Sequence, residues 1–278
     1  VYWSSSKMTL AVREDKIGMA DLGSLLLLGT MVLWFTHEMI WDGKVPFYRD
    51  LGPYLYPMRF SLAESFKAGE LPLWDRHLAM GSPLLANFQS AVFYPPHLAF
   101  SILPFFVAIR VLFVFHYLVA ATGSYCLCRH WGHSPFLALI GAVLFTFGGY
   151  TVSLTNLLPI FQSAVWLPWA LLAWERCLRS QGLKDLLLFS FLLLIQFLTG
   201  IPEMYPMTLA LLILDGLRLK MAEANITYRK LFFLFLGGNV LVAGMAMVQV
   251  LPTLELVMQS RATGSLSYSH STHWSLQP

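Results

Sequence analysis

The chain of 278 residues is 57% hydrophobic and 12% charged, and its mean hydropathy is +0.62. A water-soluble domain carries roughly 25% charged residues, so this composition excludes an ordinary soluble protein and predicts a chain that lies in a lipid bilayer. The net charge of +3 comes with no basic stripe interleaved with aromatic residues, so we expect no nucleic acid partner.

Long apolar segments recur along the chain. A helix needs about 20 apolar residues to cross a bilayer, and about seven segments approach that length. We therefore expect an all-α polytopic membrane protein, with one membrane domain over residues 1–278. The expected spans are residues 20–40, 105–126, 136–154, 158–177, 185–199, 204–219 and 231–251, of which the fifth and sixth are short.

Lysine and arginine are concentrated in the connectors on one side of these expected spans. Because such residues favour the cytoplasmic side, the N-terminus is expected in the cytoplasm. Residues 41–104 then form an extracytoplasmic loop between the first and second spans.

This loop is expected to be folded, because plain connectors have a median of about 4–6 residues. Leu55, Met58, Leu62 and Phe66 recur at helical spacing and predict an amphipathic helix that lies flat on the outer face. Arg59 is expected off this apolar stripe, and Gly69 is expected to end the helix. Residues 84–103 are interrupted by proline and predict an interfacial or re-entrant piece.

Asp50 is the candidate catalytic residue of the loop. Its carboxylate could act as a general base or a metal ligand at the membrane surface. Alternatively, it could cap the following helix, with Pro53 in the first turn, because Asp is a favoured N-cap residue. Asp42 and Asp75 are weaker candidates that could simply be solvated.

Glu203 is the second candidate, at the outer turn between two short spans. A carboxylate in hydrocarbon is costly, so it should face a cavity or a partner, or else it lies in water as an ordinary loop residue. His97, Arg110 and His116 could pair with these acids. His37 and Glu38, after the first span, are an equally ambiguous pair.

Other chemistry has little support in the sequence. Cys126, Cys128 and Cys177 fall near expected helix ends, and we interpret them as small buried residues rather than zinc ligands. The sequence has no run of metal ligands, no phosphate-binding glycine loop and no nucleophile elbow.

Several short motifs resemble a known family. They are Phe47–Asp50 with Pro57, Gly69-Glu70-Leu71-Pro72-Leu73-Trp74, Gly81-Ser82-Pro83-Leu84, Asn87-Phe88-Gln89, Phe93-Tyr94-Pro95, Gly200-Ile201-Pro202-Glu203 and Gln249-Val250-Leu251-Pro252. With one helix, a long outer loop and then many spans, the chain resembles the bacterial YfhO-like membrane proteins of the GT-C glycosyltransferase superfamily.

The resemblance implies a transferase in the cytoplasmic (inner) membrane of a bacterium or archaeon. It implies a membrane lipid partner, a polyprenyl-phosphate-linked sugar donor, and an acceptor in the cell envelope, outside the cytoplasm. Asp50 matches the position of the family's base, and Asp50 and Glu203 could share a divalent metal such as Mg or Mn. The substrate-binding residues expected from these motifs and from the arginines of the outer side are Arg49, Arg59, Trp74, Arg76, Asn87, Gln89, Tyr94 and Arg110.

Two other functions stay open. A transporter or flippase would share the spans, although the polar residues cluster outside rather than in mid-span. A non-catalytic membrane scaffold could keep the same fold. Because the chain begins at Val1 and ends in the polar segment 261–278, we expect it to be the N-terminal part of a longer protein.

Overall fold

The computed structural model describes residues 18–78, 80–180 and 182–259, so both ends on which the fragment hypothesis depends lie outside the described residues. The described fold is α-helical apart from one pair of two-residue strands, which confirms the expected all-α class. The α-helices are α1 (Met19–Phe35), α2 (His37–Ile40), α3 (Leu55–Lys67), α4 (Ala99–Ile102), α5 (Phe105–His130), α6 (Pro135–Phe147), α7 (Gly149–Ser153), α8 (Leu158–Ala164), α9 (Leu167–Ser180), α10 (Leu183–Phe197), α11 (Met204–Ala222) and α12 (Tyr228–Gln259). The short 3-10 helices are η1 (Arg49–Leu51), η2 (Phe88–Ser90), η3 (Pro95–Leu98) and η4 (Leu154–Asn156).

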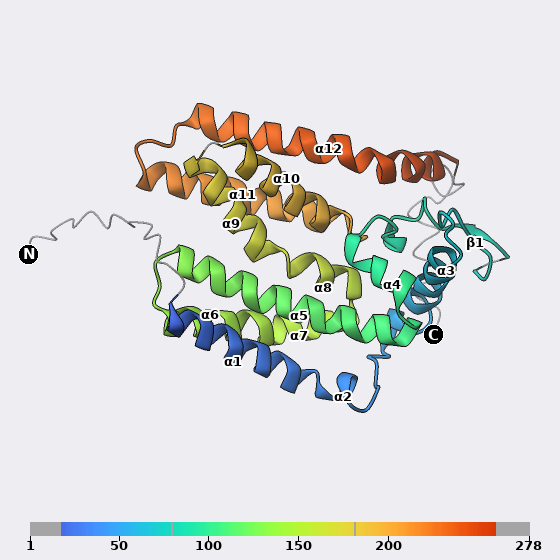
Figure 1. Cartoon of the computed structure of the whole chain (residues 1–278). Coiled ribbons are helices and arrows are strands. Elements are labelled where there is room, and N and C mark those ends of the chain that lie inside the picture. The colour runs from blue at the N-terminus through green and yellow to red at the C-terminus, as the bar shows by residue number, and fades with distance from the viewer. Residues whose placement is uncertain (1–17, 79, 181, 260–278) are drawn as a thin grey trace, which may run out of the picture.

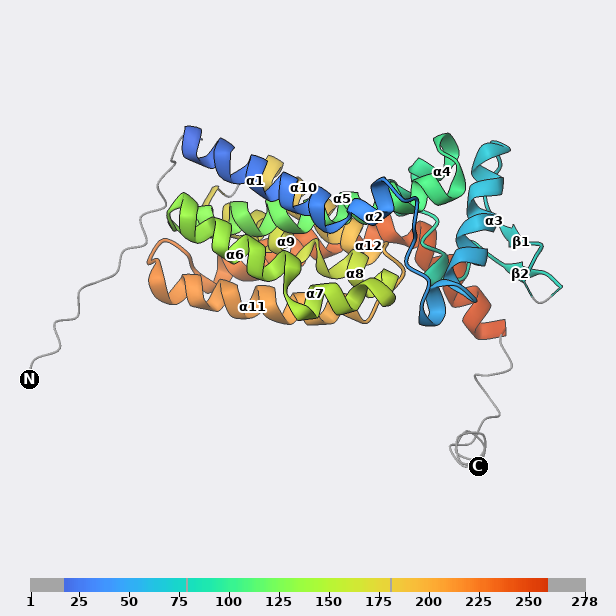
Figure 2. The ribbon, with the colours of Figure 1, turned by 90° about the horizontal axis from the view of Figure 1, so that it is seen from below.

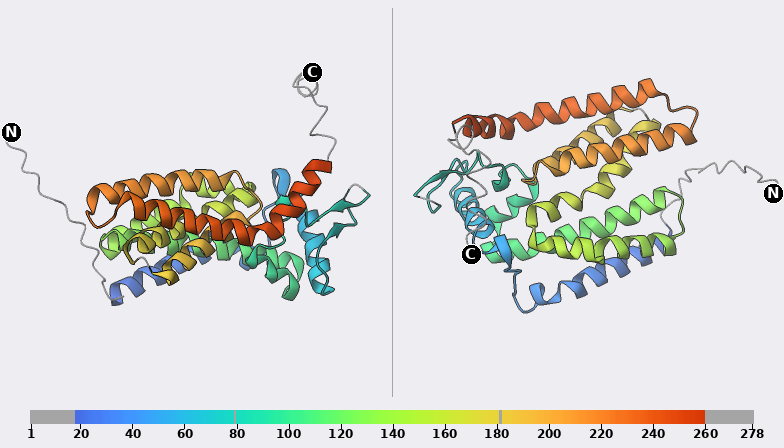
Figure 3. Two further views of the ribbon diagram at one scale, coloured as in Figure 1. Left: turned by 90° about the horizontal axis from the view of Figure 1, so that it is seen from above. Right: turned by 180° about the vertical axis from the view of Figure 1, so that it is seen from behind.

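The longer helices form one bundle. Figure 1 shows α1, α5, α6, α10, α11 and α12 running side by side along one direction, and Figure 2 shows the same arrangement from below. Helix α5 packs against α1, α6 and α9, while α10 packs against α9 and α12. The loop segments around α3 gather at one end of this bundle, next to the C-terminal part of α12 (Figure 3).

Three helical segments are long and apolar enough to cross a membrane. By length and composition they are Phe105–His130, Pro135–Asn156 and Tyr228–Gln259. Helix α1 is apolar but has only 17 residues. The expectation of seven spans is therefore wrong in number, since three segments meet both criteria in the part of the chain that is described.

Each of the remaining expected spans falls short for a physical reason. The span expected at 158–177 is split into α8 and α9, which have 7 and 14 residues. Helix α10 has 15 residues, which gives roughly 22 Å of rise against about 30 Å of hydrocarbon. Helix α11 is long enough, but Asp215, Arg218 and Lys220 lie within it.

The amphipathic helix of the loop is confirmed as α3, which ends before Gly69, whose φ is +70°. Figure 2 shows α3 lying across the bundle axis rather than along it. Leu55, Met58 and Leu62 are buried, as their spacing predicts, but Ser61 and Ala63 are buried as well. The helix is thus packed on more than one side and is not simply laid on a surface.

The rest of the loop is short irregular structure packed against the bundle. Strand β1 (Trp74–Asp75) pairs antiparallel with β2 (Ser82–Pro83). Residues 84–103 form η2, η3 and α4 and bury Tyr94, His97 and Phe100. This segment covers the end of the bundle, and its buried face explains how its prolines and broken helices are tolerated.

Candidate functional site

Asp50 lies in η1, and η1 is in contact with η4 of the bundle. Its side chain is exposed, and the described residues give it no hydrogen bond and no ion pair. The helix-capping alternative is wrong, because α3 begins only at Leu55, its N-cap residue is Tyr54, and no side chain caps it. The Asp50 carboxylate is therefore exposed and takes part in no hydrogen bond or ion pair within the described residues.

Arg49, directly before Asp50, has a backbone φ of +52°. Residues other than glycine rarely occupy this left-handed region, and such strain is commonly found at functional sites. The side chain of Arg49 is exposed beside Asp50 in the sequence.

Glu203 is also exposed, at the N-cap position of α11, where its side chain makes no capping hydrogen bond. The turn before it touches the loop, because a Cβ on Gly200 would lie 3.1 Å from the carbonyl oxygen of Phe88. No interaction joins Asp50 to Glu203 among the described residues. Two ionised carboxylates are both acceptors and share no hydrogen bond, so a joint role of Asp50 and Glu203 stays a prediction.

A divalent metal shared by Asp50 and Glu203 stays a prediction. Mg²⁺ is usually bound by one or two carboxylates together with water and substrate phosphates, so two carboxylates could be enough. Within residues 18–78, 80–180 and 182–259, no group of three or more His, Cys, Asp or Glu side chains is placed to hold an ion. The three cysteines are free thiols, and Cys177 is buried.

Arg59 was expected off the apolar stripe of α3, but it lies on the buried face of that helix. Its side chain is 0% exposed, and its Nη1 donates a hydrogen bond to the carbonyl oxygen of Ser90. Burial lowers the pKa of Arg59 to about 9, against the raising effect of Tyr54 and Tyr94, so the group stays charged at neutral pH. Arg59 follows Leu55 by four residues and precedes Leu62 by three, and this spacing places it on the buried face.

Tyr94 is the centre of a buried hydrogen-bonded cluster rather than a surface residue. Its hydroxyl donates to Nε2 of His116 at 2.6 Å and accepts from the indole nitrogen of Trp166 at 2.8 Å. Burial raises the pKa of Tyr94, so the hydroxyl keeps its proton. His116 is committed to this cluster and does not pair with an acid, contrary to one of the expected pairings.

His97 makes a second buried contact between the loop and the bundle. Its Nδ1 lies 2.9 Å from the carbonyl oxygen of Ala91, and its Nε2 lies 3.3 Å from Nε2 of Gln162 in α8. Burial, together with the nearby charge of Arg59, lowers the pKa of His97 well below its ordinary value. Gln162 and Trp166 were missed in the sequence, because nothing in their spacing marks them as partners of the loop.

Four other expected substrate-binding residues differ in burial and in hydrogen bonding. Asn87 Oδ1 accepts from the backbone N–H of Gln89 at 3.1 Å and so caps η2, while its Nδ2 donates to the hydroxyl of Tyr54. The Gln89 side chain is half-buried and has no hydrogen bond in the described part of the chain. Trp74 is half-exposed beside Gly81, whereas Arg76 is exposed.

Two further expectations concern structural residues. Arg110 donates from Nη1 to the carbonyl oxygen of Met39 at 3.3 Å and from Nε to that of Phe106, so it joins α5 to α2. Asp75, a weak catalytic candidate that could have been simply solvated, is 1% exposed and accepts hydrogen bonds from Ser61 and from the backbone of His77. Both residues hold the loop in place.

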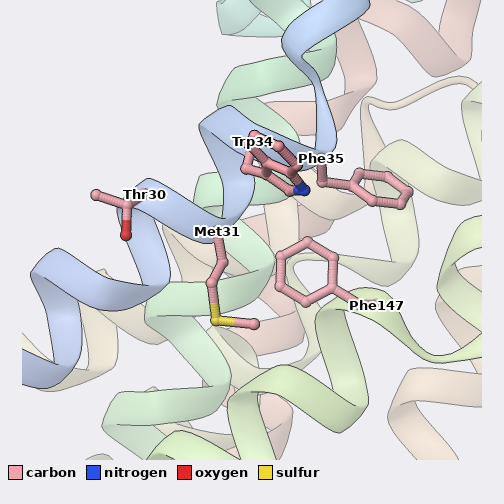
Figure 4. A pocket seen from close by; sticks show the side chains of 5 residues that line it. All are labelled: Thr30, Met31, Trp34, Phe35 and Phe147. Carbon is pink, nitrogen blue, oxygen red and sulfur yellow. The ribbon is translucent and has the colours of Figure 1, made fainter.

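A groove between α1 and α6 is the larger of the two cavities described. Its volume is about 420 Å³, and it is lined by Thr30, Met31, Trp34, Phe35 and Phe147. Figure 4 shows the aromatic rings of Trp34, Phe35 and Phe147 around it. None of the expected site residues lines this groove, and neither Asp50 nor Glu203 lines the second cavity, which adjoins Arg59.

A charged cluster lies at the opposite end of the bundle. Glu175 of α9 is fully buried and accepts hydrogen bonds from Trp131, Arg179 and Arg218 at 2.7–2.9 Å. Arg179 also binds Glu223, and Arg218 binds Asp215. The cluster joins α9 to α11 and to the end of α5.

Comparison of the chain with family models, curated proteins and solved structures finds no match.

Proposed function

We propose that the protein is a membrane glycosyltransferase that moves a sugar from a polyprenyl-phosphate carrier to an extracytoplasmic acceptor, with Asp50 as the general base. The observation that carries this proposal is the state of Asp50. It is an exposed carboxylate without a partner in the described chain, it follows a residue with left-handed backbone, and it lies on a folded loop at one end of an apolar helix bundle.

The chemistry is an inverting substitution. Asp50 takes the proton of the acceptor hydroxyl as that oxygen forms a bond to the anomeric carbon. The bond from the anomeric carbon to the lipid phosphate breaks at the same time, and the phosphate leaves as an anion. General base catalysis of this kind contributes roughly 10²–10⁴-fold.

The leaving phosphate needs positive charge nearby. Arg59 and Arg110 are excluded from this role, because the first is buried and the second is bound to backbone oxygens of α2 and α5. Arg49 and Arg76 remain, since both side chains are exposed and carry no hydrogen bond or ion pair within the described residues. Arg49, adjacent to Asp50, is the better placed of the two.

The direct test is Asp50→Asn, assayed with a polyprenyl-phosphate-linked hexose in membrane vesicles. We expect sugar transfer to fall about 100-fold or more, because the amide cannot accept the proton. Asp42→Asn is the matched control, since Asp42 is an exposed carboxylate of the same loop that pairs with Lys44. Transfer at the wild-type rate in Asp50→Asn would remove Asp50 from the mechanism.

We also propose that α3 and its loop face the outside of the cell. The support is the concentration of lysine and arginine in the connectors at the other end of the bundle. Exposed Lys67 and Lys184 suit a test, in which Lys67→Cys and Lys184→Cys are labelled in intact cells by an impermeant maleimide. Labelling of Lys184→Cys alone would reverse the orientation.

A non-catalytic scaffold is the second candidate. It is favoured by the internal use of the buried polar groups, since Arg59, Tyr94 and Asn87 all bind other residues of the loop or the bundle. Neither described cavity includes Asp50. Wild-type protein that inserts normally but transfers no sugar from the donor would favour this function.

A further inference from the structure

Three cations lie around the turn that joins α11 to α12, at the end of the bundle opposite α3 (Figure 1). We call Lys220, Arg229 and Lys230 the turn cations. Nζ of Lys220 lies 5.5 Å from the centre of the Tyr228 ring, and Tyr228 directly precedes the other two cations in the sequence. Nζ of Lys230 donates a hydrogen bond to the carbonyl oxygen of Asn225 in the turn at 2.9 Å. The positive charges are therefore gathered around one short connection.

The neighbouring carboxylates do not neutralise the turn cations. Glu175, Asp215 and Glu223 lie at the same end of the bundle, but their arginine partners are Arg179 and Arg218. Two guanidinium groups against three carboxylates leave one negative charge, which cannot balance three cations. Within the described part of the chain, the turn cations contact aromatic rings and a backbone oxygen instead of an acid. This end of the bundle therefore carries a surplus of positive charge.

The helix that follows the turn places these cations at the edge of a membrane. Helix α12 is long and apolar enough to cross a bilayer, and Arg229 and Lys230 directly precede the apolar segment that starts at Leu231. Phe232 and Phe233 are exposed in that segment, and the guanidinium carbon of Arg229 lies 5.7 Å from the centre of the Phe233 ring. A bilayer that α12 crosses would cover these rings, so the cations beside them lie at the level of the lipid headgroups.

We propose that the turn cations bind the phosphate headgroup of an anionic phospholipid, whose acyl chains lie along the exposed rings at the start of α12. A phospholipid matches both parts of this surface, because its phosphate is negative and its chains are apolar. An acidic soluble protein would match the charge but not the rings of Phe232 and Phe233 beside it. The site lies at the end of the bundle opposite the loop, and it does not depend on the proposed transferase function.

The test measures the lipid preference of the whole protein in a neutral detergent. Native mass spectrometry gives dissociation constants for phosphatidylglycerol, which is anionic, and for phosphatidylcholine with the same acyl chains, which is zwitterionic. We expect the wild type to bind phosphatidylglycerol roughly 10–100-fold more tightly, because each Lys or Arg near an anionic lipid surface contributes about fivefold. Equal dissociation constants for the two lipids would overturn the proposal.

Matched variants locate the site on the molecule. When all three turn cations are replaced by glutamine, the preference for phosphatidylglycerol should fall to within about threefold. The control replaces three exposed cations of the loop at the other end of the bundle, Lys44, Lys67 and Arg76, by glutamine. This control has the same net charge as the first variant and should keep the wild-type preference. A control that loses the preference as fully would show general charge attraction and overturn the site.

Two measurements on the wild type do not depend on how a variant folds. The preference should weaken as ammonium acetate is raised from about 0.1 to about 0.5 M, because salt screens charges at an exposed surface. A preference that does not change with salt would overturn the proposal. Inorganic phosphate should displace phosphatidylglycerol no more than acetate of equal ionic strength does, because it has no acyl chains. Full displacement by phosphate would show a site for free anions and would overturn the lipid assignment.

Discussion

Replacing Glu175 by glutamine is expected to lower the free energy of unfolding, because Glu175 holds together the end of the bundle opposite the loop. Burial alone raises the pKa of Glu175, but hydrogen bonds from His130 and Trp131 and the charge of Arg179 bring it from 4.5 down to about 2. The difference of 2.5 pKa units corresponds to about 3 kcal/mol at 1.36 kcal/mol per unit. This magnitude suits a fully buried carboxylate whose removal leaves two arginines short of a partner.

The pH dependence gives the sign of this effect. Because the pKa of Glu175 is lower in the folded protein than in the unfolded chain, its contribution is complete above pH 4.5 and is lost as the pH falls through about 2. The difference in free energy of unfolding between wild type and Glu175→Gln should be about 3 kcal/mol at pH 7. It should shrink to about 0.4 kcal/mol at pH 2, where the Glu175 carboxyl of the folded protein is half protonated, and vanish below that pH.

Denaturant unfolding of the protein in mixed micelles, followed by tryptophan fluorescence, measures both quantities. Glu64→Gln is the control, because the Glu64 side chain is 51% exposed and, among the described residues, pairs with His77 alone, so its loss should cost under about 1 kcal/mol. A Glu175→Gln variant within 1 kcal/mol of wild type at pH 7 would refute the reasoning. So would a difference that stays constant down to pH 2.

Two further predictions concern the contact between the loop and the bundle. Gly200→Ala should lower the free energy of unfolding by about 1–3 kcal/mol more than Gly132→Ala does. Both glycines have positive φ, but of the two only Gly200 would place a Cβ against the backbone of η2. Equal losses of free energy in urea titrations would contradict this. The free energy of unfolding of the wild type should also fall as the pH drops below about 6.5, because His97 binds a proton in the unfolded chain but not in the folded protein, where it is buried beside Arg59 and His116. In His97→Gln, the slope of this free energy against pH should flatten by up to about 1.4 kcal/mol per pH unit. An unchanged slope would exclude His97 as the cause.

The parts of the fold that depend on local pattern were predictable. The apolar residues of α3 recur at three and four residues, and Gly69 follows the helix with positive φ, so the burial of Leu55, Met58 and Leu62 and the end of the helix were anticipated, whereas the burial of Arg59 was not. The long apolar helices α5 and α12 were also anticipated, because hydropathy over about 20 residues is a property of the segment itself. Helices α8 and α10 were mistaken for spans because the sequence does not show where a helix in an apolar segment ends.

The candidate site was less predictable, because burial of a polar residue depends on distant partners. Asp75 was interpreted as a weak catalytic candidate or a solvated residue, yet it is buried and accepts a hydrogen bond from Ser61 of α3. Tyr94 was assigned to substrate, yet its partners are His116 in α5 and Trp166 in the turn between α8 and α9, 22 and 72 residues away in sequence. Local spacing carries no information about such contacts, so motif resemblance alone mixes structural residues with functional ones.

Burial also decides which substitutions can test the function. Changing Arg59, Tyr94 or Asp75 would leave buried partners unpaired, so a loss of transfer in such a variant would follow from damage to the loop as readily as from lost chemistry. The side chains of Asp50 and Arg49 are exposed and make no hydrogen bond or ion pair within the described chain, so their substitution should leave the unfolding free energy within about 0.5 kcal/mol of wild type. A variant at either position that unfolds like the wild type and transfers no sugar would therefore report on catalysis rather than on folding.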